Sequence, residues 1–286
     1  MFEKKNVILC HNDEMIKILK ENSKYKSIDK LSDKILNLRQ KIWLGLYHAI
    51  KISYKKVPFH NFSHAVKVAI NCMRILYEIG EKNLNKEKLG IPFDYSKLEE
   101  LLFLAALLHD AGHGYYSTEE DEIKSAELAE KLLRKYGYSL KAINYVKKLV
   151  LATTFRDRKK INEKGDIFEK IIADADIARS VWGSFEDFIR KEINLFIEIN
   201  KDWTNVDEKI WGLVKSKEWF MEFLKKAGWG EVFLLPETKK LFPYSKENLI
   251  KLQKMSPEEL KKKFEEEWRR FYWYDFFWES PIMVVV

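Results

Sequence analysis

The chain has 286 residues, 46% of them hydrophobic, so it is long enough to bury a sizeable core. Its net charge of +7 would favour anionic partners, but Lys and Glu are mostly interleaved, which is typical of solvated helix faces. The two cysteines, Cys10 and Cys72, lie outside any CxxC pattern, which excludes a disulfide framework and a zinc knuckle. No apolar run approaches the length of a membrane span, and the N-terminus lacks signal-peptide features. We therefore expect a cytoplasmic protein without a membrane partner.

Apolar residues recur at spacings of three and four along nearly the whole chain, and Gly and Pro are scarce at 11 and 6 residues. This pattern predicts an all-α fold. The expected helices cover, in chain order, 31–54, 61–80, 97–110, 120–136, 139–154, 166–181, 184–200, 207–227, 246–254 and 257–278. Glycines and prolines cluster between 228 and 245 and predict a boundary there. We expect an N-terminal segment (1–30), a catalytic helical domain (31–227) and a C-terminal helical extension (228–286).

The first group of polar residues that could bind a metal or take part in catalysis is the sequence FHNFSHA at residues 59–65. Asn61 can cap a helix that begins just after Pro58. His60 and His64 are four residues apart, so both rings can project toward the same side of that first turn. The spacing therefore predicts two neighbouring imidazoles.

The second group is LAALLHDAGHG at residues 104–114, which ends a strongly apolar predicted helix. His109 and Asp110 then lie where the buried scaffold meets the mouth of a pocket, and Gly112 lets the backbone turn away. A charged aspartate at the end of a core helix needs a partner. This position predicts a functional carboxylate.

The third group is IIADADIA at residues 171–178, where the isoleucines mark the packed side of a predicted helix. Asp174 or Asp176 can face inward, and burying either one is costly unless a cation or hydrogen bonds compensate it. The pattern leaves open which of the two does so.

Four of the six histidines fall within these groups, and imidazole with carboxylate is a ligand mixture that divalent metals accept. We expect His64, His109, Asp110 and one of the two later aspartates to hold an octahedral ion, leaving positions for water and a substrate oxygen. His60 is close but not needed as a ligand, so it could protonate a leaving oxygen. The residues thus predict metal-assisted hydrolysis.

The three groups together resemble the HD-domain metal-dependent phosphohydrolases, which are named for a pair like His109 and Asp110. FHNFSHA is similar to the (Tyr/Phe)-His-Asn-x-x-His-Ala motif of the cyclic-nucleotide phosphodiesterase branch, which also marks small bacterial HD phosphohydrolases. LAALLHDAGHG resembles the next family motif, and the sequence ADI at 175–177 resembles the Ala-Asp-Leu of the phosphodiesterases. The resemblance covers residues 40–200 and implies an all-helical HD-domain bundle.

By this resemblance, the metal ligands are His64, His109, Asp110 and Asp176. His60 would be the general acid, and His113, also counted among the catalytic residues, would contact a metal ligand or the metal-bound water. One divalent ion would be tightly bound, with room for a second, and the motifs do not distinguish Mn, Mg, Fe, Co, Ni and Zn. The sequence EDEIKSAE at 120–127 is similar to an acidic stretch of the small bacterial members, in which Glu122 could reach the metal water or a second ion.

The sequence also departs from the phosphodiesterase pattern. Thr154 stands where those enzymes carry Asp, and the Gln and aromatic clamp that reads the purine are absent, so specificity for cyclic AMP or GMP is not implied. An anionic small-molecule nucleotide is still the expected substrate. The candidate substrate contacts are Arg179, Lys159 and Thr154, with Arg158 as a further basic candidate.

The C-terminal sequence WRRFYWYDFFW at residues 268–278 interleaves aromatic residues with arginines and could stack bases of a single strand. Packing on the helical domain or a homodimer contact is the favoured interpretation of so dense an aromatic block. We expect a phosphohydrolase that splits a phosphodiester or phosphoanhydride of a nucleotide or cyclic-nucleotide-like substrate. Two alternatives stay open: an HD nuclease acting on single-stranded nucleic acid, and a catalytically silent nucleotide-sensing module.

Overall fold

The computed structural model describes residues 28–42, 44–55, 57, 59–81, 84, 91–114, 120–154, 157–181, 184–199, 233–243, 245–263 and 265–266. Within these ranges there are helices and no strand, which confirms the predicted all-α class. The helices are α2 (Ile28–Lys41), α3 (Leu44–Ser53), α4 (Phe62–Ile79), α6 (Tyr95–Leu108), α7 (Asp121–Lys135), α8 (Leu140–Leu151), α9 (Arg158–Lys164), α10 (Ile167–Val181), α11 (Phe185–Ile199), α13 (Pro236–Leu241) and α14 (Ser245–Lys254).

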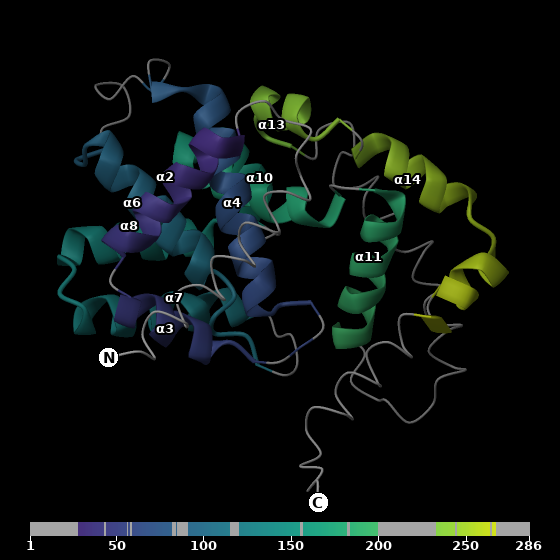
Figure 1. Cartoon of the computed structure of the whole chain (residues 1–286), viewed down its shortest axis with the longest axis horizontal. Helices are drawn as coiled ribbons and strands as arrows, with labels where there is room; N and C mark the ends of the chain where they lie inside the picture. Colours follow the sequence, from purple (N-terminus) through teal and green to yellow (C-terminus); the bar gives the residue numbers. More distant parts are fainter. Residues whose placement is uncertain are drawn as a thin grey trace, which may run out of the picture.

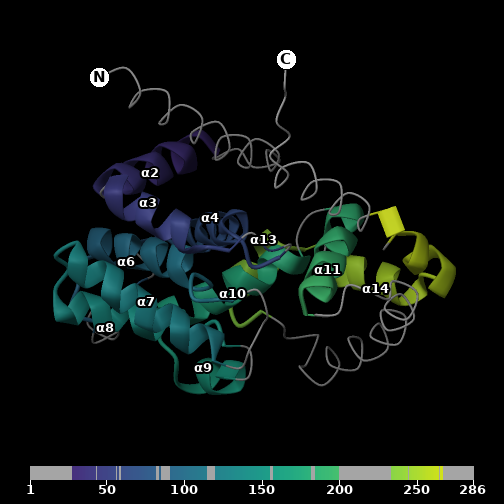
Figure 2. The same ribbon diagram turned by 90° about the horizontal axis from the view of Figure 1, so that it is seen from below.

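Helix α4 lies at the centre of the bundle, with α6 and α10 packed along it. Helix α8 packs on α6, and α7 packs on α8 (Figure 1). Figure 2 shows α2, α3 and α4 above α6, α7 and α8, whereas α11 and α14 lie toward the other end of the molecule. This arrangement brings α4, α6 and α10 together, and these three helices carry the predicted metal ligands.

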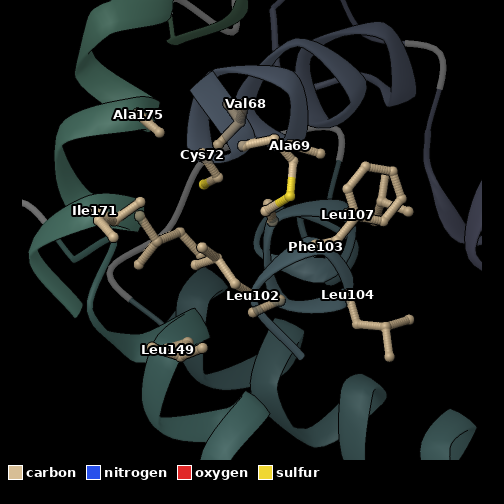
Figure 3. Packing of buried hydrophobic residues seen from close by; sticks show 14 of the residues in the cluster. Val68, Ala69, Cys72, Leu102, Phe103, Leu104, Leu107, Leu149, Ile171 and Ala175 are labelled. Carbon is tan, nitrogen blue, oxygen red and sulfur yellow. The ribbon is translucent and has the colours of Figure 1, made fainter. Parts of the chain in front are cut away.

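The core is built where these helices meet. Val68 and Cys72 of α4 lie on the side toward Ile171 of α10, and Phe103 of α6 and Leu149 of α8 belong to the same cluster (Figure 3); all five are essentially fully buried. Burying an aliphatic or aromatic side chain of this size contributes about 1.5–3 kcal/mol. The predicted metal ligands on α4, after α6 and on α10 therefore lie beside a fully buried part of the core.

Helix α6 explains how the polar pair His109 and Asp110 can follow a strongly apolar sequence. Its residues from Leu101 to Leu108 are all buried, because α4 and α8 cover it on different sides. A helix that is apolar all round is stable only when it is enclosed in this way. His109, which directly follows α6, is thereby held on a rigid support.

The helix pattern differs from the predicted one at three places. The predicted helix 31–54 is two helices, α2 and α3, separated by a bend at the buried residue Ile42, which carries no sequence signal for a break. Helix α9 was not expected as an element. Pro236 is in the first turn of α13 rather than in a loop, because proline's fixed φ suits that position.

The C-terminal part of the described chain contacts the helical bundle. Helix α13 packs against α4 and α10, and Thr238 and Phe242 are buried there. The proposed boundary at residue 228, like the predicted helix 207–227, lies outside the described residues, as does the aromatic block 268–278. The division into domains stays a prediction.

None of the helices that the structure describes combines the length and the hydrophobicity required to cross a membrane.

Candidate metal centre

Three structural elements bring the predicted ligands to one point. His64 lies in the first turn of α4, His109 follows the last residue of α6, and Asp176 lies on α10. Asn61 caps α4 as the sequence predicts, since its side chain accepts the backbone N–H of His64 at 3.1 Å. The start of α4 is thereby fixed, and the first ring of the cluster with it.

Four donor atoms converge. The Nε2 atoms of His64 and His109 are 3.1 Å apart. Asp176 Oδ1 lies 3.1 Å from His64 Nε2 and 3.5 Å from His109 Nε2. Asp110 Oδ2 lies 3.1 Å and 2.9 Å from the same two nitrogens. The structure therefore groups all four predicted ligands, with Asp176 rather than Asp174 as the fourth.

The chemistry of this donor set fits a divalent cation. His109 Nδ1 donates to the Ala106 carbonyl at 2.8 Å, so Nε2 is the ring nitrogen that faces the other donors. Asp110 Oδ2 is buried and accepts no hydrogen bond from any described residue. Ring nitrogens and carboxylate oxygens this close need positive charge among them, from a metal ion or from protons on the imidazoles. Burial lowers the pKa of His109, but Asp110 and Asp176 outweigh it and raise that pKa well above its usual value. Metal bonds of about 2.1 Å place adjacent octahedral ligands about 3.0 Å apart, which matches the observed spacing.

The electrostatics also favour a cation. Burial raises the pKa of Asp110, but the imidazoles around it, His109 foremost, hold that pKa well below its usual range. Burial likewise opposes ionisation of Asp176, and contacts with His109 and His64 outweigh it, so its pKa is also lowered. Both carboxylates therefore stay negatively charged at neutral pH.

A second group of donors adjoins the first. One ligand atom from each of His60, Asp110 and His113 lies within 4.8 Å of the others, and His113 Nε2 is 3.2 Å from Asp110 Oδ1. Asp110 thus presents one oxygen to each group. On the other side of the His113 ring, Asp121 Oδ2 lies 3.7 Å from Nδ1. This placement is compatible with the predicted second ion, which stays a prediction.

Glu198 on α11 is the functional candidate that sequence analysis missed. Its Oε1 is 2.6 Å from His60 Nδ1, and its Oε2 accepts the backbone N–H groups of Phe59 and His60 at 2.8 and 2.9 Å. Burial lowers the pKa of His60, but the charges of Asp110 and Glu198 outweigh it and raise that pKa. The signal in the sequence was a single Glu within LFIEI at 195–199, an apolar stretch in which a buried carboxylate needs a partner.

The remaining predicted residues take different positions. Glu122 is half-buried near the centre, where burial and the charges of Asp110 and Asp176 raise its pKa. Thr154 is half-buried in the turn after α8, and Lys159 is exposed on α9. Arg179 is on α10, one turn beyond the predicted ligand, and its side chain lies outside the described residues. Contacts of these residues with a substrate stay predictions.

Arg158 does not have the role that the sequence suggested. Its guanidinium donates to Asp174 Oδ1 at 2.8 Å and to the Ala173 carbonyl at 2.7 Å. These bonds commit it to α10 rather than to a phosphate.

Gly112 allows a close approach to α7, whereas the sequence predicted that it would allow the backbone to turn. Its φ is not positive; instead, a Cβ at this position would lie 2.3 Å from the Ser125 nitrogen and 2.4 Å from the Lys124 carbonyl carbon of α7. The Gly112 N–H also donates to the buried Ser125 hydroxyl at 3.0 Å. The loop that holds Asp110 and His113 is therefore pressed against α7.

Gly112→Ala should destabilise the fold by about 1–3 kcal/mol, the cost of overpacking, and weaken metal binding, because backbone cannot move aside cheaply. Thermal unfolding and Mn²⁺ titration measure the two effects. Gly45→Ala is the matched control, since its Cβ meets only the Tyr136 side chain, at 3.2 Å or more. Wild-type values for Gly112→Ala would contradict the close approach.

Comparison with known proteins gives two results. Residues 61–178 match the family model of the HD domain. The crystal structure of the phosphodiesterase domain of Salpingoeca rosetta rhodopsin phosphodiesterase is similar, with a TM-score of 0.54 and 14% sequence identity over 88% of this chain and 93% of that one. At this identity the likeness concerns the fold. No curated protein matches the sequence. The family match confirms the resemblance seen in the motifs: the chain contains an HD domain at residues 61–178.

Proposed function

We propose that this protein is a metal-dependent phosphohydrolase that cleaves a phosphodiester or phosphoanhydride bond in a nucleotide or cyclic-nucleotide-like substrate. The observation that carries the proposal is the convergence of two imidazole nitrogens and two carboxylate oxygens, from His64, His109, Asp110 and Asp176, at 2.9–3.5 Å. The HD-domain match and the fold shared with a phosphodiesterase domain support the same chemistry.

These four residues would hold the ion. A divalent ion bound there would lower the pKa of a coordinated water and neutralise charge on a phosphoryl oxygen. The His109 imidazole is oriented by the bond of its ring to Ala106 before any ligand arrives, and the cap of α4 fixes the backbone from which the His64 ring projects. The site is therefore preorganised on its nitrogen side.

His60 is suited to protonate the leaving oxygen. Its Nδ1 is held by Glu198, which leaves Nε2 as the ring nitrogen available for proton transfer. The carboxylate also stabilises the protonated ring and helps to raise its pKa, which favours a role as proton donor. Glu198 is thus the carboxylate that positions the proposed acid.

The test is hydrolysis by metal-stripped protein that is reconstituted separately with Mn, Mg, Fe, Co, Ni and Zn. The substrates are mononucleotides, cyclic mono- and dinucleotides and short oligonucleotides. We expect product only with a metal present, and none from an Asp110→Ala variant assayed in parallel.

Other outcomes would redirect the proposal. Activity confined to oligonucleotides, with steep salt dependence, would favour the nuclease. Metal binding without any turnover would favour the sensing module. The aromatic block 268–278, which suggested the nuclease, lies outside the described residues.

A further inference from the structure

Asp174 is a fully buried carboxylate outside the metal centre that accepts three hydrogen bonds from described residues. It is 0% exposed, and its Oδ1 accepts hydrogen bonds from the Arg158 guanidinium and the Leu234 N–H, each at 2.8 Å. Its Oδ2 accepts the Leu235 N–H at 2.9 Å. Three elements distant in sequence therefore meet at one side chain: the start of α9, the middle of α10, and the segment 233–235 that leads into α13.

The position of this carboxylate on α10 relates it to the metal centre. Asp174 and Asp176 are two residues apart, so their side chains leave the helix about 200° from each other. Asp176 contacts His64 and His109 on one side of the helix, while Asp174 is bound by Arg158 and the segment 233–235 on another. Helix α10 is thus fixed from two sides, and neither rotation nor sliding is free.

The backbone bonds make the segment 233–235 a specific partner. Leu234 and Leu235 donate N–H groups that only a well-placed acceptor can satisfy, and Leu235 is itself buried. If the segment left, Asp174 would keep a buried charge with fewer donors around it, which is unfavourable. Docking of the segment and the position of α10 are therefore mutually dependent.

We propose that Asp174 is a positioning residue for the metal centre: by binding the segment 233–235 it holds α10 where Asp176 can share an ion with His64 and His109. This inference rests on the proposed metal-binding function and adds a part of the chain beyond residues 61–178 to it. The segment 233–235 thereby contributes to metal affinity without touching the ion.

Coupling of this kind is reciprocal. If docking of the segment raises the affinity for metal, metal must strengthen docking by the same factor. In the wild-type protein, the amides of Leu234 and Leu235 should therefore exchange more slowly with solvent when Mn²⁺ is bound. The gain should exceed that of amides in α2, which carries none of the residues of the metal centre.

The variants test the same coupling by substitution. We expect Asp174→Asn and Arg158→Met, in the full chain, to lower the Mn²⁺ affinity about 10-fold, within the range of roughly 5–150-fold that couplings span. Leu133→Ala, a fully buried position of α7, is the matched control: it should lower the melting temperature and leave the affinity unchanged. Titration calorimetry and thermal unfolding supply the two readouts.

The outcomes separate the two proposals. Failure of the wild-type protein to bind any divalent metal would remove the proposed function, and this inference with it. Tight binding by the wild type, with equal affinity in both variants or with no selective protection at Leu234 and Leu235, would overturn the positioning role alone. Amide exchange needs no substitution, so it decides the question even if a variant does not fold.

Discussion

Asp110→Ala is expected to abolish metal-dependent hydrolysis and to weaken divalent-metal binding by more than about 100-fold, beyond what the loss of an outer-shell partner costs. The reason is its central place: Oδ2 lies against His64 and His109, and Oδ1 lies against His113. Removing it therefore takes one oxygen from each donor group. Titration of metal-stripped protein with Mn²⁺ measures the affinity, and metal analysis after dialysis gives the stoichiometry.

We do not expect unfolding to cause the loss of metal binding and activity in Asp110→Ala. Circular dichroism checks this, since the variant should show the helical signal of the wild type. Asp33→Ala is the control, since Asp33 is an exposed carboxylate of α2. It should bind metal and turn over substrate as the wild type does. Undiminished metal affinity in Asp110→Ala would show that the four converging residues are not the ligands.

His60→Ala should lower kcat by about 10²–10⁴-fold, the usual contribution of a general acid, while metal affinity stays near the wild-type value. Glu198→Gln should have a smaller effect in the same direction. A Gln at 198 can still accept the backbone N–H groups of Phe59 and His60, but it lacks the charge that stabilises a protonated ring. Steady-state kinetics should show the loss in kcat with KM little changed.

The pH profile separates the charge of Glu198 from its hydrogen bonds. Glu198 helps to raise the pKa of His60, so without that charge the pKa falls and His60 loses its proton at lower pH. The alkaline limb of kcat in Glu198→Gln should therefore move to lower pH. Glu186→Gln, an exposed position on the same helix, should leave the profile unchanged. Equal profiles in all three proteins would remove Glu198 from the mechanism.

Much of the site could be predicted because its residues lie close together in short motifs. His60 and His64 share one helical turn, and His109 and Asp110 are adjacent, so local spacing already restricts where the side chains can point. The apolar sequence before His109 also shows that α6 is enclosed. These are local properties, and the local backbone largely determines them.

The partners of Glu198 and Asp174 could not be predicted from the sequence. Glu198 lies 138 residues from the ring that it holds, and the two backbone donors to Asp174 lie 60 and 61 residues further along the chain. Periodicity places each carboxylate on a helix but cannot say which distant backbone will meet it. The choice between Asp174 and Asp176 had the same difficulty, since both lie on one helix and each could face inward.

The sequence by itself determined the helical class, the HD motifs and the four candidate ligands, because helix periodicity and motif spacing act over a few residues. The tertiary structure decided that Asp176 joins the imidazoles, that Glu198 holds His60, and that Arg158 and the segment 233–235 bind Asp174. These contacts depend on how α10 and α11 pack against the rest of the chain. Such packing follows from the burial of many side chains at once, and no single local pattern encodes it.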